Sequence, residues 1–233
     1  MFEEISQEIK SRTQWNVPPN HGWLEYKLNK IELDYVWKCI NERPIDHCNN
    51  VLAGNIDSSF PLNDKDKWFF NNTLTPLISL YNDTFSNLAV NLPIKSLFRQ
   101  LSEKDESQMV VRSSPYVDYT LSSWWVNYQK ENEFNPIHGH TGVYSFVLWL
   151  KIPTEHAEQN HPSYGVTNAP EKSNFCFSYT NILGEVCTHS YKMGKRYEGT
   201  LLFFPSKLKH IVYPYYNCSE DRISVSGNIF VDI

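Results

Sequence analysis

Hydrophobic residues recur at helical spacing in two stretches of the N-terminal half of the chain. The first stretch spans residues 29–43 and is followed by Pro44. Its apolar positions are Leu33, Val36, Trp37 and Ile40. Apolar side chains three and four residues apart line one face of an α-helix, and proline cannot continue the helix. The pattern therefore predicts an amphipathic helix that ends before Pro44.

A second helix is predicted further along, and Pro76 suits its first turn or a break between two helices. The residues of its apolar face are Leu77, Leu80, Tyr81, Phe85 and Leu88. Residues 96–106, SLFRQLSEKDE, predict a short third helix. Around these helices, we expect residues 1–28 to form an extended arm and residues 47–64 to form a loop with a short strand near Val51.

After about residue 108 the pattern changes to short β-branched and aromatic runs between turn signals. The runs are YVDYTL, SWWVNYQ, VYSFVLWLKI, NFCFSYT, EVCTHSYK, GTLLFFP, HIVYP and RISVSGNIFV. Eight short strands joined by turns predict a β-sandwich or a jelly roll, and residues 180–186, TNILGEV, predict a hairpin turn. We therefore expect a helical support region at 1–107 and a β core at 108–233, integrated into one domain.

One irregular stretch is unusually long for a connection between strands. Residues 153–173 carry few apolar residues, and connections of that length are often functional lids or mobile loops. His156 and His161 lie within this stretch, where solvated loop residues are the simpler interpretation and capping of a site is the alternative. His21, His47 and His189 are not expected to be ligands.

Composition and charge narrow the class of protein. Aromatic residues make up 15% of the 233 residues, which favours a β-rich fold, and the net charge of −5 gives no broad basic surface for nucleic acid. The five cysteines form no CxxC pair, which is typical of reduced thiols in a cytosolic protein. The acidic N-terminus and the lack of a long apolar stretch predict a cytoplasmic protein without a signal peptide or a membrane span.

The candidate chemistry begins with two histidines one residue apart, His138 and His140. In an extended strand, residues i and i+2 point to the same face, so both imidazoles could reach one metal ion. This pair alone is a weak signal. His210, at the start of another predicted strand, strengthens it because neighbouring strands of a jelly roll can supply ligands that are distant in sequence.

Arg222 and Ser224 occupy one face of the last predicted strand, RISVSGNIFV. A guanidinium fork and a hydroxyl on one strand face suit the recognition of a carboxylate. An arginine on an inward face would otherwise be a buried charge without a partner. The residues alone therefore predict a metal site carried by strands, with an anchor for an acid beside it.

The block Trp125–Ile229 resembles the 2-oxoglutarate- and Fe(II)-dependent oxygenases. GTLLFFPSKLKHIVYPYY followed by RISVS resembles the distal histidine and the arginine-x-serine element of this family, and NPIHGHTG stands at its H-x-D or H-x-E pair. The likeness is strongest to the prolyl-hydroxylase-like members and to oxygenases encoded by marine bacteriophages and bacteria. It implies an α+β, β-rich fold with a double-stranded β-helix (jelly-roll) core and N-terminal helices packed on it. It also implies Fe(II), 2-oxoglutarate and O2.

The resemblance also assigns roles to single residues. His138 would be the first iron ligand and His210 the distal one. Arg222 would pair with the distal carboxylate of 2-oxoglutarate, Ser224 would support it, and Tyr128 would donate a hydrogen bond to the same carboxylate. A packing role for Tyr128, one aromatic residue among many, is the alternative.

His140 departs from the family pattern, because it stands where the facial triad of two histidines and one carboxylate has the carboxylate. Three interpretations are open: His140 binds the metal itself, a carboxylate from elsewhere completes the site, or the site only binds and does not react. No Asp or Glu lies within four residues of His140. We favour ligation by His140, which makes His138, His140 and His210 the predicted metal ligands.

The predicted function is hydroxylation of a C–H bond, with a prolyl or other peptide substrate suggested by the resemblance. A three-histidine zinc site that activates water is a rival, but it leaves Arg222 and Ser224 without a role. A non-enzymatic jelly-roll binding module is a second rival and predicts that no metal binds. The chain could be encoded by a virus and act in the host cytoplasm, and its oligomeric state is not indicated by the sequence.

Overall fold

The fold is seen in a computed structural model, which describes residues 22–48, 54–85, 118–160 and 171–231. The predicted helix at 96–106, the predicted strand near Val51, Leu88 of the second predicted helix, residues 161–170 of the long predicted connection, and His21 lie outside these ranges, and His161 is among residues 161–170. None of the helices within them combines the length and the apolar character needed to cross a membrane.

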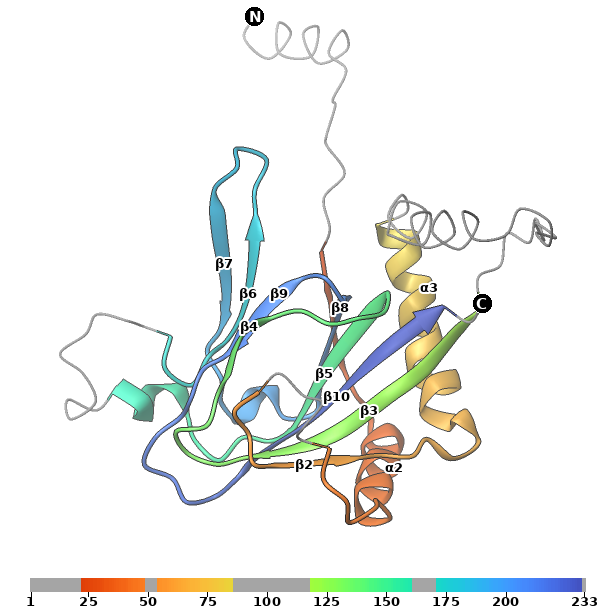
Figure 1. The fold of residues 1–233 in the computed structure, drawn as a ribbon, viewed down its shortest axis with the longest axis horizontal. Coiled ribbons are helices and arrows are strands. Elements are labelled where there is room, and N and C mark those ends of the chain that lie inside the picture. Colours follow the sequence, from red (N-terminus) through yellow and green to blue (C-terminus); the bar gives the residue numbers. More distant parts are fainter. Residues whose placement is uncertain (1–21, 49–53, 86–117, 161–170, 232–233) are drawn as a thin grey trace, which may run out of the picture.

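The described strands and helices follow one another along the chain in the order shown in Figure 1. The strands are β1 (Leu24–Lys27), β2 (Ser58–Pro61), β3 (Tyr119–Gln129), β4 (Asn135–His138), β5 (Tyr144–Lys151), β6 (Phe175–Thr180), β7 (Val186–Tyr191), β8 (Thr200–Pro205), β9 (Lys209–Val212) and β10 (Arg222–Val231). The helices are α2 (Lys30–Asn41) and α3 (Thr75–Thr84), with a π-helical turn (Phe70–Leu74) before α3 and short 3₁₀ turns at Lys65–Lys67, His156–Asn160 and Lys195–Tyr197.

The strands form two antiparallel sheets, as expected of a jelly roll. The larger sheet has six strands in the order β1-β8-β5-β10-β3-β2, and the smaller has four in the order β4-β9-β6-β7. Figure 1 shows α2 and α3 on the side of the larger sheet away from the smaller one. The predicted fold, a β-rich α+β protein with a double-stranded β-helix core and helices packed on it, is confirmed.

Helix α2 forms where the sequence predicts it and ends before Pro44. Asn29 caps its first turn: the Asn29 side chain accepts from the Glu32 backbone N–H, and the Glu32 carboxylate accepts from the Asn29 backbone N–H. This reciprocal capping box satisfies two backbone donors that would otherwise lack partners. Val36 and Ile40 are buried and direct the apolar face of α2 into the core.

Helix α3 differs from its prediction in one residue of the apolar face. Leu77, Ile78 and Tyr81 are buried, but Leu80 is 52% exposed. The buried face of α3 therefore runs through Leu77, Ile78 and Tyr81, and Leu80 lies outside it. Pro76 lies in the first turn of α3, as predicted.

Several strands differ from their predictions. Residues 119–121 of the predicted run YVDYTL and the whole run SWWVNYQ belong to the single strand β3, and residues 116–117 lie outside the described ranges. Strands β1 and β2 come from the segments predicted as an arm and a loop, and they add one strand to each edge of the larger sheet. Strand β4 was not predicted. It has only four residues, NPIH, and Pro136 together with the single aliphatic residue Ile137 gives no alternating apolar pattern. The hairpin turn between β6 and β7 is confirmed, with Gly184 at a φ of 84°.

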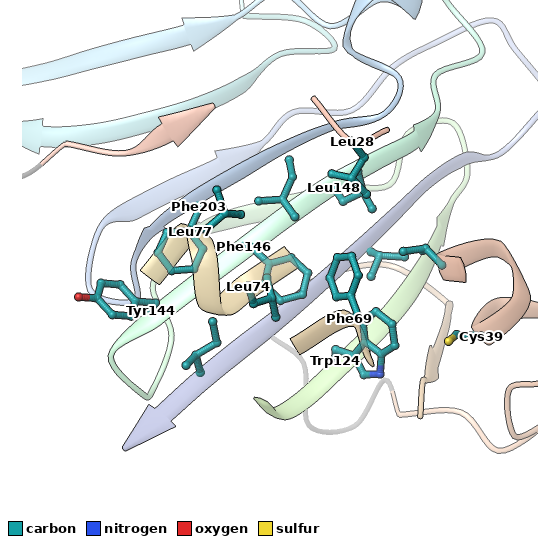
Figure 2. Close-up of a cluster of buried hydrophobic side chains, with 14 of the residues drawn as sticks. Leu28, Cys39, Phe69, Leu74, Leu77, Trp124, Tyr144, Phe146, Leu148 and Phe203 are labelled. Carbon is teal, nitrogen blue, oxygen red and sulfur yellow. The ribbon is translucent and has the colours of Figure 1, made fainter. Parts of the chain in front are cut away.

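Both faces of the larger sheet are covered, and each covering has its own hydrophobic cluster. On the helical side, alternate residues of the strands, among them Trp124, Phe146 and Phe203, pack against α2, α3 and Phe69 (Figure 2). On the other side, Trp149 and Phe204 pack against Phe175 and Phe177 of the smaller sheet. The period of two in each strand thus divides its side chains between the two clusters.

The side of the larger sheet that faces the smaller sheet changes from apolar to polar along the strand order. Strands β5 and β8 contribute Trp149 and Phe204 to the cluster between the sheets. Strands β10 and β3 place serine, asparagine and glutamine at the equivalent positions. These positions are Ser224, Ser226 and Asn228 in β10 and Asn127 and Gln129 in β3. Because short polar side chains do not fill the space between the sheets, a cavity remains there.

Phe69 connects the helical layer to the sheet, and its loss should lower stability strongly. The ring is fully buried and lies 5.3 Å from Trp124 and 6.0 Å from Phe146, measured between ring centroids. We expect Phe69→Ala to lower the free energy of unfolding by about 3–5 kcal/mol in chemical denaturation, because it leaves a cavity in the core. Leu80→Ala, on the exposed side of α3, is the control and should change it by less than about 0.5 kcal/mol. Equal effects of the two substitutions would contradict this packing.

Candidate metal centre

His138 is the last residue of β4, an edge strand of the smaller sheet. Pro136 can lie in this strand because an edge strand leaves one row of backbone groups without ladder partners. The register between β4 and β9 shifts between Asn135 and His138, and this shift places His138 directly opposite His210. Backbone pairing therefore brings together two histidines that are 72 positions apart in the numbering of the chain.

His140 reaches the same point in a different way from the one predicted. Strand β4 ends at His138, so His140 does not lie two residues further along a strand. Its backbone N–H instead donates to the Ser206 carbonyl at 2.7 Å, which holds the turn against the end of β8. The His140 Nε2 atom then lies 3.2 Å from the His210 Nε2 atom.

The three imidazoles converge on one point. A ring nitrogen from each of His138, His140 and His210 lies within 4.8 Å of the other two. Within the described ranges, no aspartate or glutamate is part of this cluster. The geometry thus agrees with ligation by His140, and the described residues do not offer a carboxylate that would replace it.

Hydrogen bonds to backbone carbonyls orient two of the rings. His138 Nδ1 lies 2.7 Å from the Pro136 carbonyl oxygen, and His210 Nδ1 lies 3.0 Å from the Leu208 carbonyl oxygen. A carbonyl oxygen only accepts, so both Nδ1 atoms carry the proton and both Nε2 atoms keep a free lone pair. This second layer of contacts fixes the ring orientation in the way that metal-binding histidines require.

The charge state of the cluster also suits a metal. Burial lowers the pKa of His140 to about 4, and the neighbouring His138 lowers it further. Burial also lowers the pKa of His138, and it lowers that of His210 well below the usual value. The imidazoles are therefore neutral at physiological pH, and only a neutral imidazole can donate a nitrogen lone pair to a cation.

A cavity of about 460 Å³ lies beside the cluster, between the two sheets. Trp125, Trp149 and Phe175 form part of its wall, and Trp125 lies 6.2 Å from the His140 ring, measured between centroids. The polar strip from β3 and β10 forms another part. Among the described residues that line the cavity there is no Asp, Glu, Lys or Arg.

Arg222 lies at the start of β10, at 1% exposure, and its surroundings are neutral. Its NH2 donates to the Ser173 carbonyl at 3.1 Å and to the Ser173 hydroxyl at 2.5 Å, and its NH1 lies 3.4 Å from the Gln129 Oε1 atom. The guanidinium also lies over the ring of Tyr215, 4.9 Å from its centroid. Burial lowers the pKa of Arg222 to about 10, so the group remains charged at neutral pH.

The shell around this buried charge is incomplete within the described part of the chain. The Nε–H group of Arg222 is buried without an acceptor there, and no carboxylate forms an ion pair with the guanidinium. A buried charge of this kind is costly unless an anion meets it. Its free donor therefore fits the carboxylate of an acid.

Ser224 and Tyr128 lie on opposite sides of the larger sheet. Ser224 lines the cavity, two residues along β10 from Arg222 as predicted. Tyr128 is not among the residues that line it. It packs against the cluster on the helical side, with the Phe60 ring 6.0 Å away and the Arg43 guanidinium 5.2 Å from its centroid. The structure thus brings Ser224 to the cavity but not Tyr128, for which it favours the packing role.

Sequence reasoning missed Asn127 and Gln129, the two neighbours of Tyr128 that do face the cavity. The alternation of side chains between the two faces of the strand SWWVNYQ could have predicted them. Trp125, Asn127 and Gln129 share one face of the strand, whereas Trp124 and Tyr128 share the other. Tyr128 has the predicted distance from His138 in sequence, but it lies on the other face of β3.

The donor set and the arginine fit the cofactors that the resemblance implies. Three neutral imidazole nitrogens are suitable ligands for Fe(II), and they are equally suitable for other divalent metals. The charged and partly unsatisfied Arg222 fits the distal carboxylate of 2-oxoglutarate. The cavity between them is within the usual size range for small-molecule sites.

Comparisons with known proteins agree with these features. Residues 123–228 match a family model described as "Putative 2OG-Fe(II) oxygenase". No curated protein matches the sequence. The expected likeness to oxygenases of marine bacteriophages stays a prediction.

Three solved structures resemble the chain at low identity. A prolyl-4-hydroxylase from Pseudomonas putida has 13% identity and a TM-score of 0.47, with 92% of this chain and 95% of that chain covered. A prolyl hydroxylase from Trichoplax adhaerens, in complex with a hypoxia inducible factor peptide fragment, has 12% identity and a TM-score of 0.41, covering 91% and 84%. HygX from Streptomyces hygroscopicus, with nickel, 2-oxoglutarate and hygromycin B bound, has 9% identity and a TM-score of 0.42, covering 90% and 83%.

The matched region contains all three histidines together with Arg222 and Ser224. The match therefore confirms the predicted family and its cofactors, Fe(II) and 2-oxoglutarate, with O2 as the oxidant. Residues 123–228, a little under half of the chain, match the 2-oxoglutarate- and Fe(II)-dependent oxygenase family.

Proposed function

We propose that His138, His140 and His210 hold the Fe(II), and that the enzyme hydroxylates a C–H bond of a peptide, with a prolyl residue as the first candidate. The observation that carries this proposal is the convergence of three neutral imidazoles at the wall of a cavity. Beyond the polar strip of this cavity lies the buried Arg222, which has no anionic partner among the described residues. When bound, Fe(II) and 2-oxoglutarate together supply the oxidising chemistry.

The three histidines would bind the metal without a change in their own charge. In the metal-free protein, His210 Nε2 has a lone pair, so the 3.2 Å contact is a hydrogen bond donated by His140 Nε2. For a divalent cation to bind both nitrogens, the His140 proton would move from Nε2 to Nδ1, so that both Nε2 atoms become ligands and both rings stay neutral. Because all three ligands are neutral, the centre keeps the full positive charge of the metal, which favours binding of an anionic 2-oxo acid beside it.

Arg222 and Ser224 would receive the distal carboxylate of 2-oxoglutarate. The guanidinium has a free Nε–H donor and no anion among the described residues, and the Ser224 hydroxyl lines the cavity two residues further along the same strand face. A charge-assisted pair in this dry environment would orient the acid and satisfy the buried charge of Arg222. Trp125 and Trp149 would exclude water from the remaining wall.

The lining of the cavity supports an uncharged, hydrogen-bonding substrate. Apart from the three histidines and Cys48, its described polar side chains are mainly amides and hydroxyls, and Asn127 already accepts a hydrogen bond from the Ser59 hydroxyl at 2.8 Å. Peptide groups offer the matching donors and acceptors, whereas a charged substrate group would lose its hydration without a counter-charge. A zinc site formed by the three histidines would give the buried Arg222 no anion to bind. A non-enzymatic binding module would give neither the histidines a metal nor Arg222 an anion.

Replacement of a proposed ligand should remove the metal. We expect His210→Ala to weaken Co(II) binding more than about 100-fold, since loss of a ligand should exceed the 10–100-fold effect typical of its supporting partners. Visible absorption of Co(II) during titration measures this affinity. His189→Ala, on the exposed face of β7, is the matched control and should bind Co(II) like the parent protein. Unchanged Co(II) binding in the His210 variant would contradict the proposed metal site.

Metal affinity should resist mild acid. Burial lowers the pKa of all three histidines, that of His140 to about 4, so the cluster takes up protons at a lower pH than free imidazoles do. The Co(II) affinity should therefore fall less than about threefold from pH 7.5 to pH 6 and decline only as the pH approaches 4. Three histidines with the ordinary pKa would lose ~50-fold over the same range. A loss of that size would contradict the neutral, buried cluster.

Arg222 should govern binding of the acid without affecting the metal. We expect Arg222→Met to cost about 2–5 kcal/mol of 2-oxoglutarate binding free energy, because a buried charge-assisted pair is lost. Calorimetric titration of 2-oxoglutarate into Co(II)-loaded protein measures this cost. Arg196→Met, on the exposed turn at Lys195–Tyr197, is the control. Binding of 2-oxoglutarate by the Arg222 variant at the parent affinity would exclude Arg222 as the anchor.

A further inference from the structure

Gln129 stands between the cavity and the buried arginine. It lines the cavity and is 2% exposed, whereas Arg222, directly opposite it in the β3–β10 register, does not line the cavity. A carboxylate that enters from the histidine cluster therefore meets the Gln129 side chain before it reaches the Arg222 guanidinium.

The contact between these two side chains is the weakest part of the arginine's surroundings. The Gln129 Oε1 atom accepts from Arg222 NH1 at 3.4 Å, while both Ser173 acceptors lie closer to NH2. The Gln129 amide is held from its other end, where Nε2 donates to the Glu133 carbonyl at 2.6 Å. A long bond to a neutral acceptor is easily exchanged for a short bond to a carboxylate.

We propose that Gln129 is a positioning residue for the 2-oxo acid: its amide oxygen holds Arg222 in the acid-free protein and gives up this place to the distal carboxylate when the acid binds. This inference rests on the proposed role of Arg222. It explains why a neutral amide is compatible with function at position 129. A carboxylate at the same place would form a permanent ion pair with Arg222 and compete with the acid.

The test is a substitution that keeps the shape of the side chain and adds a charge. Gln129→Glu should bind Co(II) like the parent protein but bind 2-oxoglutarate at least about tenfold more weakly, because the acid must displace a buried ion pair. Calorimetry on the Co(II)-loaded protein gives both affinities. Gln129→Met, which removes the acceptor and adds no charge, should bind 2-oxoglutarate within about threefold of the parent, because the acid supplies its own acceptor.

A second ligand separates this role from a general structural effect. 2-Oxopentanoate has the same chain length as 2-oxoglutarate but lacks the distal carboxylate, so its affinity should not change in Gln129→Glu. The preference for 2-oxoglutarate over 2-oxopentanoate should therefore fall by the same factor, at least about tenfold. A substitution that merely disturbed the cavity would weaken both acids alike and leave this preference unchanged.

Two control variants make the same chemical change elsewhere. Asn127→Asp adds a charge on the same face of β3, two residues from Gln129, where the amide contacts Ser59 instead of Arg222. Its effect on the preference should be clearly smaller. Gln159→Glu changes another buried glutamine, which contacts the Tyr216 backbone and does not line the cavity, and it should leave the preference unchanged.

The outcomes separate this inference from the function on which it rests. If the Co(II)-loaded parent protein does not bind 2-oxoglutarate, the proposed function fails and the role of Gln129 fails with it. If the parent binds and Gln129→Glu keeps the same preference for 2-oxoglutarate, only the role of Gln129 is overturned. If Gln129→Glu does not fold, a Gln129→Met variant that loses most of its 2-oxoglutarate affinity while retaining Co(II) overturns it as well.

Discussion

The pairing of β10 with β5 on one side and with β3 on the other is the constraint on which the rest of the site depends. Hydrogen bonding on both edges fixes which side chains of β10 face the helices and which face the smaller sheet. Val225 and Ile229 enter the core on the helical side, and Ser224, Ser226 and Asn228 line the cavity. A slip of one residue would exchange these sets, fill the cavity with apolar side chains and bury the serines against the helices.

The charge arrangement follows from the same layering. The smaller sheet closes over the polar strip and buries the histidines enough to keep them neutral, so the cluster has lone pairs for a cation but no charge of its own. Arg222 carries a positive charge into a region without a described anion. A metal and a dicarboxylic acid would suit these two places together. The metal would supply a positive charge for the histidine lone pairs, and the acid would supply a negative charge beside Arg222.

Much of this arrangement could be predicted from the sequence, and the exceptions have physical reasons. Helix α2 and the strands of the β half follow from apolar periodicity. The three histidines and Arg222 follow from residue type and strand position, and the family resemblance assigned their roles. Strand β4 escaped because Pro136 interrupts its pattern, and the position of His140 depends on a tertiary contact with Ser206 that no local rule contains. The cavity-facing role of Gln129 depends on the register between β3 and β10, which sequence periodicity indicates only once the strands and their inner faces are known.

The most direct measurement of the central claim is an anaerobic visible spectrum of the protein with Fe(II), recorded before and after addition of 2-oxoglutarate. A 2-oxo acid that chelates Fe(II) through its carboxylate and keto oxygens produces a weak metal-to-ligand charge-transfer band. The three-histidine centre predicts that this band appears on addition of the acid and saturates at one equivalent per chain. Stoichiometric binding of Fe(II) without any band at saturating 2-oxoglutarate would contradict it.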